Sequence, residues 1–424
     1  MPLTIESITG YEILDSRGNP TVAARLKLSN GITVTGHAPS GASTGRHEAL
    51  ELRDNDPQRY GGKGVLRAVR NINDVIFAAL RGFAVDLATV DSQLIDLDGT
   101  ADKSRLGANS MLAVSCAVAR GVAESRGEPL WRTLQGSSPP SIPVPMVNIL
   151  SGGLHAAGNI EFQDFLVIGH GFDEYSEALH AITRVHLHAR RALEGRGYTV
   201  TGVADEGGWG PLLPSNETAL QILTEAIERA GYRPQEHFSI ALDVAASHFA
   251  ENGTYVLKTE GRTLTSSGMI SLLADWASKY PIASIEDALE EDDWDGWSEL
   301  TARLGAKLQL VGDDLFTTNP KRLARGMQAN AANAVLVKMN QIGTVTETLE
   351  VLELARNHGY GAVVSARSGE TEDSFLADLA VGSGAGQIKV GSITRSERLA
   401  KYNRLLEIET DGGLSYHRLS IPVS

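Results

Sequence analysis

The C-terminal half of the chain carries charged residues at the ends of short apolar segments, where they could form a catalytic site. In chain order they are Asp243 in SIALDV, Glu286 in ASIED, Asp313 in LQLVGDD, Lys338 in AVLVK, Arg367 in AVVSARS and Lys389 in GQIK. Three carboxylates come first and three cations follow. Carboxylates can hold a hard metal ion and cations can bind an anionic substrate, so the pattern predicts metal-assisted chemistry on an acid.

These charges need a scaffold that brings strand ends together. Most successive members of the series are separated by about the length of one strand and one helix. Alternation of this kind is typical of a βα barrel, in which catalytic residues gather at the C-terminal ends of the strands. The sequence therefore predicts an α/β fold with a barrel whose mouth carries the site.

The three carboxylates are oxygen ligands of the kind that Mg²⁺ prefers. Each acid taken alone could be an unrelated loop residue, but three at successive strand ends favour metal ligation. In VGDDL either Asp313 or Asp314 could be the ligand, and the strand direction favours Asp313.

The cations are expected to divide the work of catalysis and substrate binding. Lys338 at a strand end could be a surface lysine, but inside a barrel it would be desolvated and close to other cations. We therefore expect its pKa to be lowered toward that of a usable base. Arg367 and Ser368 suit a phosphate, and Lys389 suits a carboxylate.

Three further segments contain polar residues that could reach the barrel mouth. GASTGRHE (41–48) is glycine-rich but lacks the spacing of a Walker motif, and we expect it to be a mobile lid. VADEGGWGP (203–211) offers Glu206. SGGLHAAGNIEFQDF (151–165) offers His155, Gln163 and Asp164.

The composition restricts the class of protein. The 424 residues are 42% hydrophobic and 21% charged, as in an ordinary globular protein. The net charge of -14 argues against non-specific nucleic-acid binding, which needs basic surface. A single cysteine, Cys116, excludes an intramolecular disulfide.

There is no basic segment followed by an apolar core near the N-terminus and no apolar run of about 18 residues, so we expect a cytoplasmic protein without a membrane span.

The first third of the chain has a different organisation. Apolar and polar residues alternate in TIESITGYEILDS and TVAARLKLSNGITVTGHA, which predicts an antiparallel meander. Helical patterns follow in GVLRAVRNINDVIFAALRG and MLAVSCAVARGVAESRG. The stretch LQGSSPPSIPVP (134–145) is typical of a linker. We expect an N-terminal α+β domain over residues 1–134 and a barrel domain over residues 140–424.

Specific motifs along the chain resemble those of the enolase family from about residue 5 to 407. They include LDSRGNPTV, APSGASTGRHEALELRD, LGANSMLAVS, VPMVNILSGGLHA, DEGGWGP, SIEDALEEDDWDGW, VGDDLFTTNP, KMNQIGT, RSGETEDSFLADLAVG and QIKVGSITRSERLAKYN. The resemblance implies a small α+β N-terminal domain and an atypical barrel whose first strands are partly antiparallel. It also implies two Mg²⁺ per site, a small phosphorylated three-carbon acid as substrate, and a homodimer or homo-octamer.

The resemblance assigns roles to the metal ligands and the acid–base residues. Asp243, Glu286 and Asp313 match the ligands of the first Mg²⁺, and Ser43 matches the residue that closes over the substrate and helps hold the second. Lys338 matches the base that takes the C2 proton of 2-phosphoglycerate. Glu206 matches the general acid at the leaving 3-hydroxyl.

The same resemblance assigns the substrate contacts. Lys389 matches the cation near the substrate carboxylate, and Arg367 and Ser368 match the phosphate contacts. His155 matches a histidine of a mobile loop, and Gln163 is expected to bind substrate beside it.

Two departures from the family pattern lie on the side where hydroxyl leaves. Ala366 in SARSGETED stands where the family has histidine, and Asp164 in FQDF stands where it has glutamate. We expect Asp164 to act with Glu206 and His155 in catalysis. Retracting a carboxylate by one methylene moves it by about 1 Å, which can cost on the order of 10²-fold in rate.

The departures lead to a hypothesis of altered chemistry. In it, the protein is a specialised enolase-like enzyme such as carboxyphosphonoenolpyruvate synthase of phosphonate antibiotic pathways, with a second, phosphonate-type substrate. One alternative is an ordinary glycolytic enolase that converts 2-phosphoglycerate to phosphoenolpyruvate and water. The other is a non-catalytic enolase that serves as a scaffold, although an intact carboxylate and lysine set argues against it.

Overall fold

The N-terminal part of the chain contains a three-stranded antiparallel sheet. The structure is a computed structural model that describes residues 3–41 and 45–419. Strands β1 (Ile5–Leu14), β2 (Pro20–Leu28) and β3 (Thr33–His37) pair in that order. The alternating sequence pattern predicts this meander, and the structure confirms it.

Helices cover this sheet, and one of them contacts it very closely. Helix α4 (Ala108–Arg126) is buried along most of its length and packs on β2 and β3. A Cβ atom on Gly36 of β3 would lie 2.2 Å from the Ala113 carbonyl oxygen, so only glycine allows this approach. Cys116 is buried at the same contact. Helices α3 (Leu87–Asp98) and α5 (Leu130–Thr133) also belong to this part.

The helix expected over residues 64–82 is interrupted. It consists of α1 (Leu66–Arg70), a π-helical segment (Asn71–Ile76) and α2 (Phe77–Leu80). The Asn73 amide accepts a hydrogen bond from the Gly10 nitrogen at 2.8 Å and donates one to the Gly10 oxygen at 3.1 Å. The wider turn brings Asn73 onto the backbone of β1, a contact that helical periodicity alone does not reveal.

The C-terminal part is a closed barrel of eight strands with one irregular wall. Strands β4 and β5 and strands β5 and β6 pair antiparallel, and all other neighbouring pairs are parallel. The expected α/β fold, an N-terminal α+β domain followed by an atypical barrel, is therefore confirmed. In spatial order the strands are β10 (Ile282–Glu286), β11 (Gln309–Gly312), β12 (Ala334–Val337), β13 (Gly361–Ser365), β14 (Gly386–Gly391), β4 (Val144–Ser151), β5 (Asp164–Gly169) and β6 (Phe238–Asp243).

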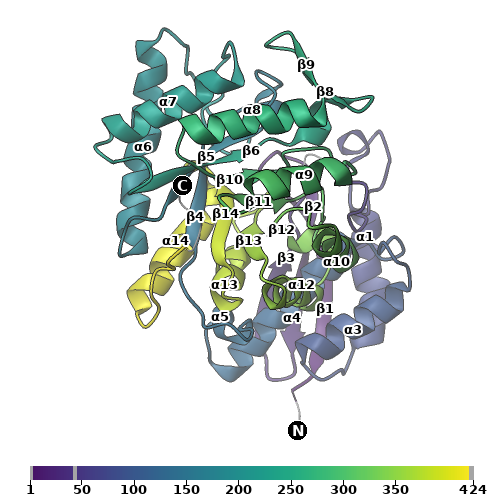
Figure 1. Cartoon of the computed structure of the whole chain (residues 1–424). Helices are drawn as coiled ribbons and strands as arrows, with labels where there is room; N and C mark the ends of the chain where they lie inside the picture. The colour runs from purple at the N-terminus through teal and green to yellow at the C-terminus, as the bar shows by residue number, and fades with distance from the viewer. Residues whose placement is uncertain (1–2, 42–44, 420–424) are drawn as a thin grey trace.

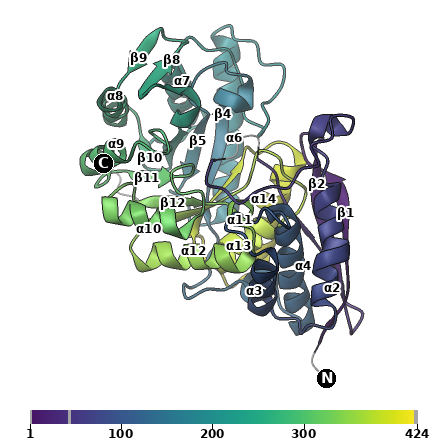
Figure 2. The same ribbon diagram turned by 90° about the vertical axis from the view of Figure 1, so that its right-hand side faces the viewer.

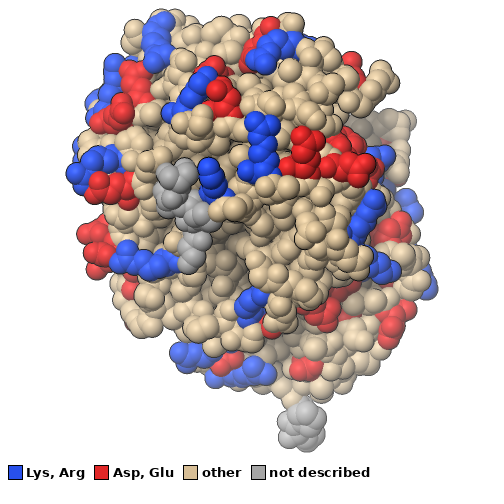
Figure 3. Space-filling model, viewed as in Figure 1, with Lys and Arg blue, Asp and Glu red and all other residues tan. Residues whose placement is uncertain are grey.

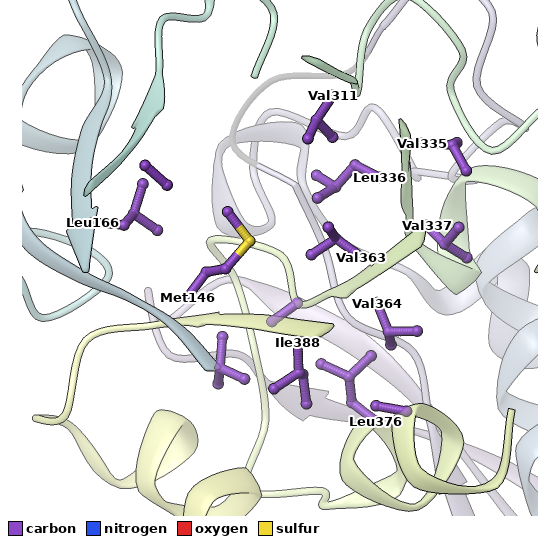
Figure 4. Packing of buried hydrophobic residues seen from close by; sticks show 14 of the residues in the cluster. Met146, Leu166, Val311, Val335, Leu336, Val337, Val363, Val364, Leu376 and Ile388 are labelled. Atoms are coloured by element: carbon purple, nitrogen blue, oxygen red, sulfur yellow. The ribbon is translucent and has the colours of Figure 1, made fainter. Parts of the chain in front are cut away.

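The barrel strands are apolar because both of their faces are buried. In Figure 4, Leu336 of β12 points toward the side chains inside the barrel, whereas Val335 and Val337 point the opposite way, toward the helices. All three are fully buried. Continuous apolar runs of this kind are typical of parallel strands covered by helices, and a charge can be placed only at a strand end or in a partnered interior position.

The remaining helices surround the barrel (Figure 1). They are α6 (Tyr175–Gly195), α7 (Asn216–Arg229), α8 (Ser266–Lys279), α9 (Trp294–Leu304), α10 (Pro320–Ala329), α11 (Met339–Ile342), α12 (Val345–Asn357), α13 (Phe375–Gly382) and α14 (Ser396–Asp411). A small sheet of β7 (Ala250–Glu251), β8 (Thr254–Leu257) and β9 (Arg262–Leu264) lies at one edge. Within the described residues, no helix has the length and apolar character needed to cross a membrane.

The N-terminal part lies against one side of the barrel, where α4 lies beside α11 and α3 lies beside α12 (Figure 2). Ser40 and Gly369 exchange two backbone hydrogen bonds of 2.8 and 2.9 Å, and Arg120 pairs with Asp373 at 2.5 Å. These contacts place Ser40 and helix α4 beside the loop after β13. On the face shown in Figure 3, described Lys and Arg side chains stand among Asp and Glu side chains.

Candidate active site

The six charged residues of the series gather at one end of the barrel. Asp243 and Glu286 are the last residues of β6 and β10, and Asp313 and Lys338 directly follow β11 and β12. Arg367 lies two residues beyond β13, and Lys389 lies within β14. One cavity there is lined by nine of the expected site residues and by Ala366: His155, Gln163, Glu206, Asp243, Asp313, Lys338, Arg367, Ser368 and Lys389.

Lys389 pairs with two of the predicted metal ligands. Its Nζ lies 2.8 Å from Asp243 Oδ2 and 2.7 Å from Glu286 Oε2. Gln163 Nε2 donates to the same Asp243 oxygen at 3.2 Å. Burial alone would lower the pKa of Lys389, but the two carboxylates raise it well above its usual value. Lys389, predicted to contact a substrate carboxylate, thus contacts two protein carboxylates here.

The pKa of Lys338 is raised, not lowered as we expected. Its Nζ donates to Asp313 Oδ2, and Gln341 Nε2 donates to the other Asp313 oxygen at 3.0 Å. Burial acts to lower the pKa of Lys338, but the Asp313 carboxylate outweighs it, so the pKa is raised. The expectation was wrong because it counted desolvation and neighbouring cations and left out the acid on the adjacent strand.

The acidic residues at the barrel mouth offer the oxygen ligands that Mg²⁺ prefers. Among the described residues, the acid and histidine groups whose ligand atoms all lie within 4.8 Å do not include the predicted trio of Asp243, Glu286 and Asp313. These groups are His155–Asp164–Glu206, Asp287–Asp313–Asp314 and Glu290–Glu291–Asp292. Within the described part of the chain, however, Glu286 Oε1 is buried without a hydrogen-bond partner. A free buried carboxylate oxygen beside two cavity-lining aspartates fits a hard divalent cation.

Asp287 is an acid of this cluster that the sequence did not single out. It adopts a left-handed backbone conformation with φ 43, and its carboxylate accepts hydrogen bonds from the Asp313 and Asp314 nitrogens at 2.9 and 2.8 Å. Burial raises the pKa of Asp287 well above its usual value. Asp287 therefore fixes the backbone that presents Asp313 to the cavity.

Arg367 is buried and paired with an acid from the N-terminal part. Its NH1 lies 2.9 Å from Glu48 Oε2 and 3.1 Å from Asn340 Oδ1, and only 4% of its side chain is exposed. Glu48 belongs to the GASTGRHE segment, for which we expected a lid, but no local pattern marks Glu48 itself as a site residue. Ser43 of that segment, the expected second-metal residue, lies outside the described residues.

A second charged group lies on the side where hydroxyl is expected to leave. His155 Nδ1 is 3.1 Å from Asp164 Oδ2, and His155 Nε2 is 3.7 Å from Glu206 Oε1. Asp164 begins β5 and is completely buried, and the Asn148 amide donates to its other oxygen. The expected trio of Asp164, Glu206 and His155 is thus brought together.

The charges in this group place the exchangeable proton on the imidazole. Burial opposes a charged His155, but Glu206 and Asp164 outweigh it and raise its pKa to about 9. Burial raises the pKa of Asp164 to about 6. Burial would also raise the pKa of Glu206, but His155 and Arg398 hold it below its usual value. Glu206, assigned as the general acid, is therefore a carboxylate next to an imidazolium.

Ala366 lies at the cavity wall and adds no donor. Ala366 is one of the residues that line the cavity, and its side chain cannot donate a hydrogen bond. Its backbone nitrogen donates to the Lys389 oxygen, at 2.9 Å. The histidine expected from the family pattern is therefore replaced by an apolar surface on a wall next to Arg367.

The fold and the site together define a class of protein: a barrel enzyme with acid–base and carboxylate groups at the mouth, next to a small α+β domain. Comparison with known proteins gives the family. Residues 5–134 match the enolase N-terminal domain, and residues 139–417 match the enolase C-terminal TIM barrel domain. Enolase 1 of Methylococcus capsulatus is 52% identical over 415 residues, which cover 97% of this chain and 98% of that protein. The chain belongs to the enolase family and is a Mg²⁺-dependent, lyase-type enzyme.

Proposed function

We propose that this protein is an ordinary enolase that converts 2-phosphoglycerate to phosphoenolpyruvate and water. The observation that carries the proposal is that one cavity is lined by a lysine–carboxylate set and, on the hydroxyl side, by an imidazolium next to a carboxylate. The near full-length similarity to a protein named Enolase 1 supports it. The hypothesis of a carboxyphosphonoenolpyruvate synthase rested on Asp164 and Ala366, and the comparisons favour the glycolytic alternative over it.

The carboxylates at the barrel mouth would hold the metal. Asp243, Glu286 and Asp313 offer the oxygens of one site, and the family resemblance proposes Ser43 for a second. When bound, Mg²⁺ supplies positive charge that stabilises the negative charge developing on the substrate carboxylate as the C2 proton leaves.

Lys338 would accept the C2 proton, and this requires a neutral amine. In the structure its ammonium is held by the Asp313 carboxylate, which raises its pKa. Neutralising the charge of Asp313 removes the interaction that opposes deprotonation. The base and its neighbouring metal ligand are therefore linked through one hydrogen bond, and Lys338 becomes a better base as Asp313 is neutralised.

His155 and Glu206 would deliver a proton to the leaving 3-hydroxyl. Asp164 holds Nδ1 of the imidazolium, so its Nε2 faces Glu206. Glu206 can pass on a proton that it receives from His155, and this reconciles its lowered pKa with the role of a general acid. Arg367 and Ser368 would bind the phosphate, Gln163 and Lys389 the rest of the substrate. From the family resemblance we also propose a homodimer or homo-octamer.

The proposal is tested by steady-state turnover. Purified protein with Mg²⁺ and 2-phosphoglycerate should form phosphoenolpyruvate, followed by its absorbance, with kcat in the usual enzyme range of about 1–10³ s⁻¹. An Asp164→Glu, Ala366→His double variant restores the family residues and should change kcat by less than about tenfold. A large gain of activity in that variant would instead favour the specialised enzyme.

A further inference from the structure

Helix α14 carries two buried cations behind the loop that follows β13. Arg398 is completely buried and Lys401 is 1% exposed. A buried charge is costly unless it is well partnered, so the partners of these side chains indicate their roles. Neither residue lines the cavity that holds the candidate site.

Arg398 donates mainly to backbone oxygens of the loop that carries Arg367 and Ser368. Its NH1 lies 2.6 Å from the Arg367 oxygen and 3.0 Å from the Val390 oxygen, and its NH2 donates to the Ser368 oxygen. Among the ion pairs of the described residues, its acidic partner is Glu397, at 3.5 Å, and its charge also helps to lower the pKa of Glu206. Much of its positive charge therefore faces neutral carbonyl groups directly behind Arg367 and Ser368.

The same loop is held from other sides. Lys401 Nζ donates to the Thr371 oxygen at 2.6 Å and pairs with Glu370 Oε2 at 3.0 Å. The other Glu370 oxygen accepts a hydrogen bond from the Arg367 nitrogen at 3.0 Å. With its backbone fixed from behind, the loop presents the side chains of Arg367 and Ser368 to the cavity.

We propose that Arg398 is a positioning residue for phosphate binding, which fixes the backbone of Arg367 and Ser368 and adds positive charge behind them. The substrate class, a phosphate monoester, rests on the proposed function. A neutral donor would satisfy the carbonyls equally well, whereas a guanidinium also favours an anion on the other side of the loop.

Two variants separate these contributions. Arg398→Met removes both the donors and the charge, and Arg398→Lys keeps the charge with fewer, differently placed donors. Arg404→Met is the matched control, because Arg404 is a cation of the same helix whose guanidinium pairs with Asp378 of α13 at 2.8 Å. The readouts are KM and kcat for 2-phosphoglycerate and, separately, the Kd of inorganic phosphate measured by calorimetry.

The expected result is a rise of about 10- to 100-fold in KM and in the phosphate Kd for Arg398→Met, since misplacing a binding group by about 1 Å has an effect of this order. Arg398→Lys should show a smaller rise in both constants. In Arg398→Met, kcat should change less than KM. Arg404→Met should leave KM and the phosphate Kd within about twofold of the wild-type values. Unchanged KM and phosphate Kd in a folded Arg398→Met, or an equal loss in Arg404→Met, would overturn the proposal.

Folding of the variants is checked by thermal unfolding. If Arg398→Met does not fold, Arg398→Lys decides, and an unchanged phosphate Kd in that variant overturns the proposal. If the wild-type protein does not convert 2-phosphoglycerate, the proposed function fails, but the phosphate Kd still tests Arg398 directly.

Discussion

Lys338 and Asp164 lie on opposite walls of the barrel mouth. Lys338 follows β12 and Asp164 begins β5, and these strands are four places apart in a closed barrel of eight. A substrate between them has a lysine on one side and the Asp164–His155–Glu206 group on the other. Of the two departures from the family pattern, Asp164 belongs to the second side, whereas Ala366 directly follows β13, next to β12. The lysine side and the Asp164 side can therefore be tested separately.

Replacing Lys338 with methionine should slow proton removal strongly without disrupting the fold. A positioned general base contributes about 10²–10⁴-fold, so C2 proton exchange should fall by that factor. Exchange of 2-phosphoglycerate in D₂O is followed by NMR. The control is Lys103→Met, since Lys103 is also buried and paired, with Glu347 at 2.6 Å, but lies outside this cavity. Equal C2 proton exchange in Lys338→Met and Lys103→Met would show that Lys338 is not the base.

The pKa of His155 should depend on Asp164. The two carboxylates raise it to about 9, so Asp164→Asn should shift it downward by removing one of them. Because the folded pKa lies above the ordinary value of about 6.5, the charged imidazole stabilises the fold below that pH, and this stabilisation is lost as pH rises toward 9. An NMR titration of the His155 ring measures the shift. An unchanged pKa in Asp164→Asn would contradict the ion pair.

Acid should destabilise the protein through His186. This residue stacks on Trp209 with ring centroids 4.6 Å apart, and burial lowers its pKa to about 4. The unfolded chain takes up a proton near pH 6.5 and the folded chain does not, so stability is lost as pH falls from about 6.5 to 4. The free energy of unfolding should fall by roughly 3 kcal/mol over this range, at about 1.4 kcal/mol per pH unit.

Urea unfolding at several pH values in that range tests this expectation. His186→Phe keeps an aromatic ring against Trp209 and should flatten the pH dependence. His180→Phe, at an exposed position of the same helix α6, should retain it. An equal slope in wild-type protein and His186→Phe would assign the acid sensitivity to other groups.

Mg²⁺ should stabilise the folded protein through Glu286. A ligand at about 100 times its Kd adds roughly 2.7 kcal/mol to the free energy of unfolding, which thermal unfolding with and without EDTA detects. Glu286→Gln should lose most of this effect, because Glu286 carries the unpartnered buried oxygen. Glu299→Gln, at an exposed position of α9, should keep it. An effect of Mg²⁺ that survives in Glu286→Gln would place the metal elsewhere.

The sequence was sufficient for the barrel and for the charges at its mouth. Parallel barrel strands are buried on both faces, so a charged residue fits mainly at the end of a strand. Asp243, Glu286 and Asp313 could therefore be placed at the barrel mouth from the sequence alone. The π-helical turn at Asn73 could not, since it depends on contact with Gly10 of a distant strand.

Contacts between distant segments limited the prediction of the site. Glu48 reaches Arg367 across the boundary between the two parts of the chain, and no local pattern marks that pair. The raised pKa of Lys338 depends on the side chain of Asp313 on a neighbouring strand. Arg398 lies in a helical motif that gives no sign of its role. Only its hydrogen bonds to the Arg367 and Ser368 oxygens show which loop it contacts.

We expect this chain to release the hydroxyl group, although Asp164 replaces the glutamate and Ala366 the histidine of the family pattern. The most direct measurement compares C2 deuterium exchange with phosphoenolpyruvate formation in one reaction of wild-type protein, 2-phosphoglycerate and Mg²⁺ in D₂O. Both are expected, with phosphoenolpyruvate accumulating at a rate within about tenfold of exchange, and both should slow by about 10²–10⁴-fold in Lys338→Met. Rapid exchange with almost no phosphoenolpyruvate would contradict this expectation, because the lysine side would then work while the hydroxyl side did not.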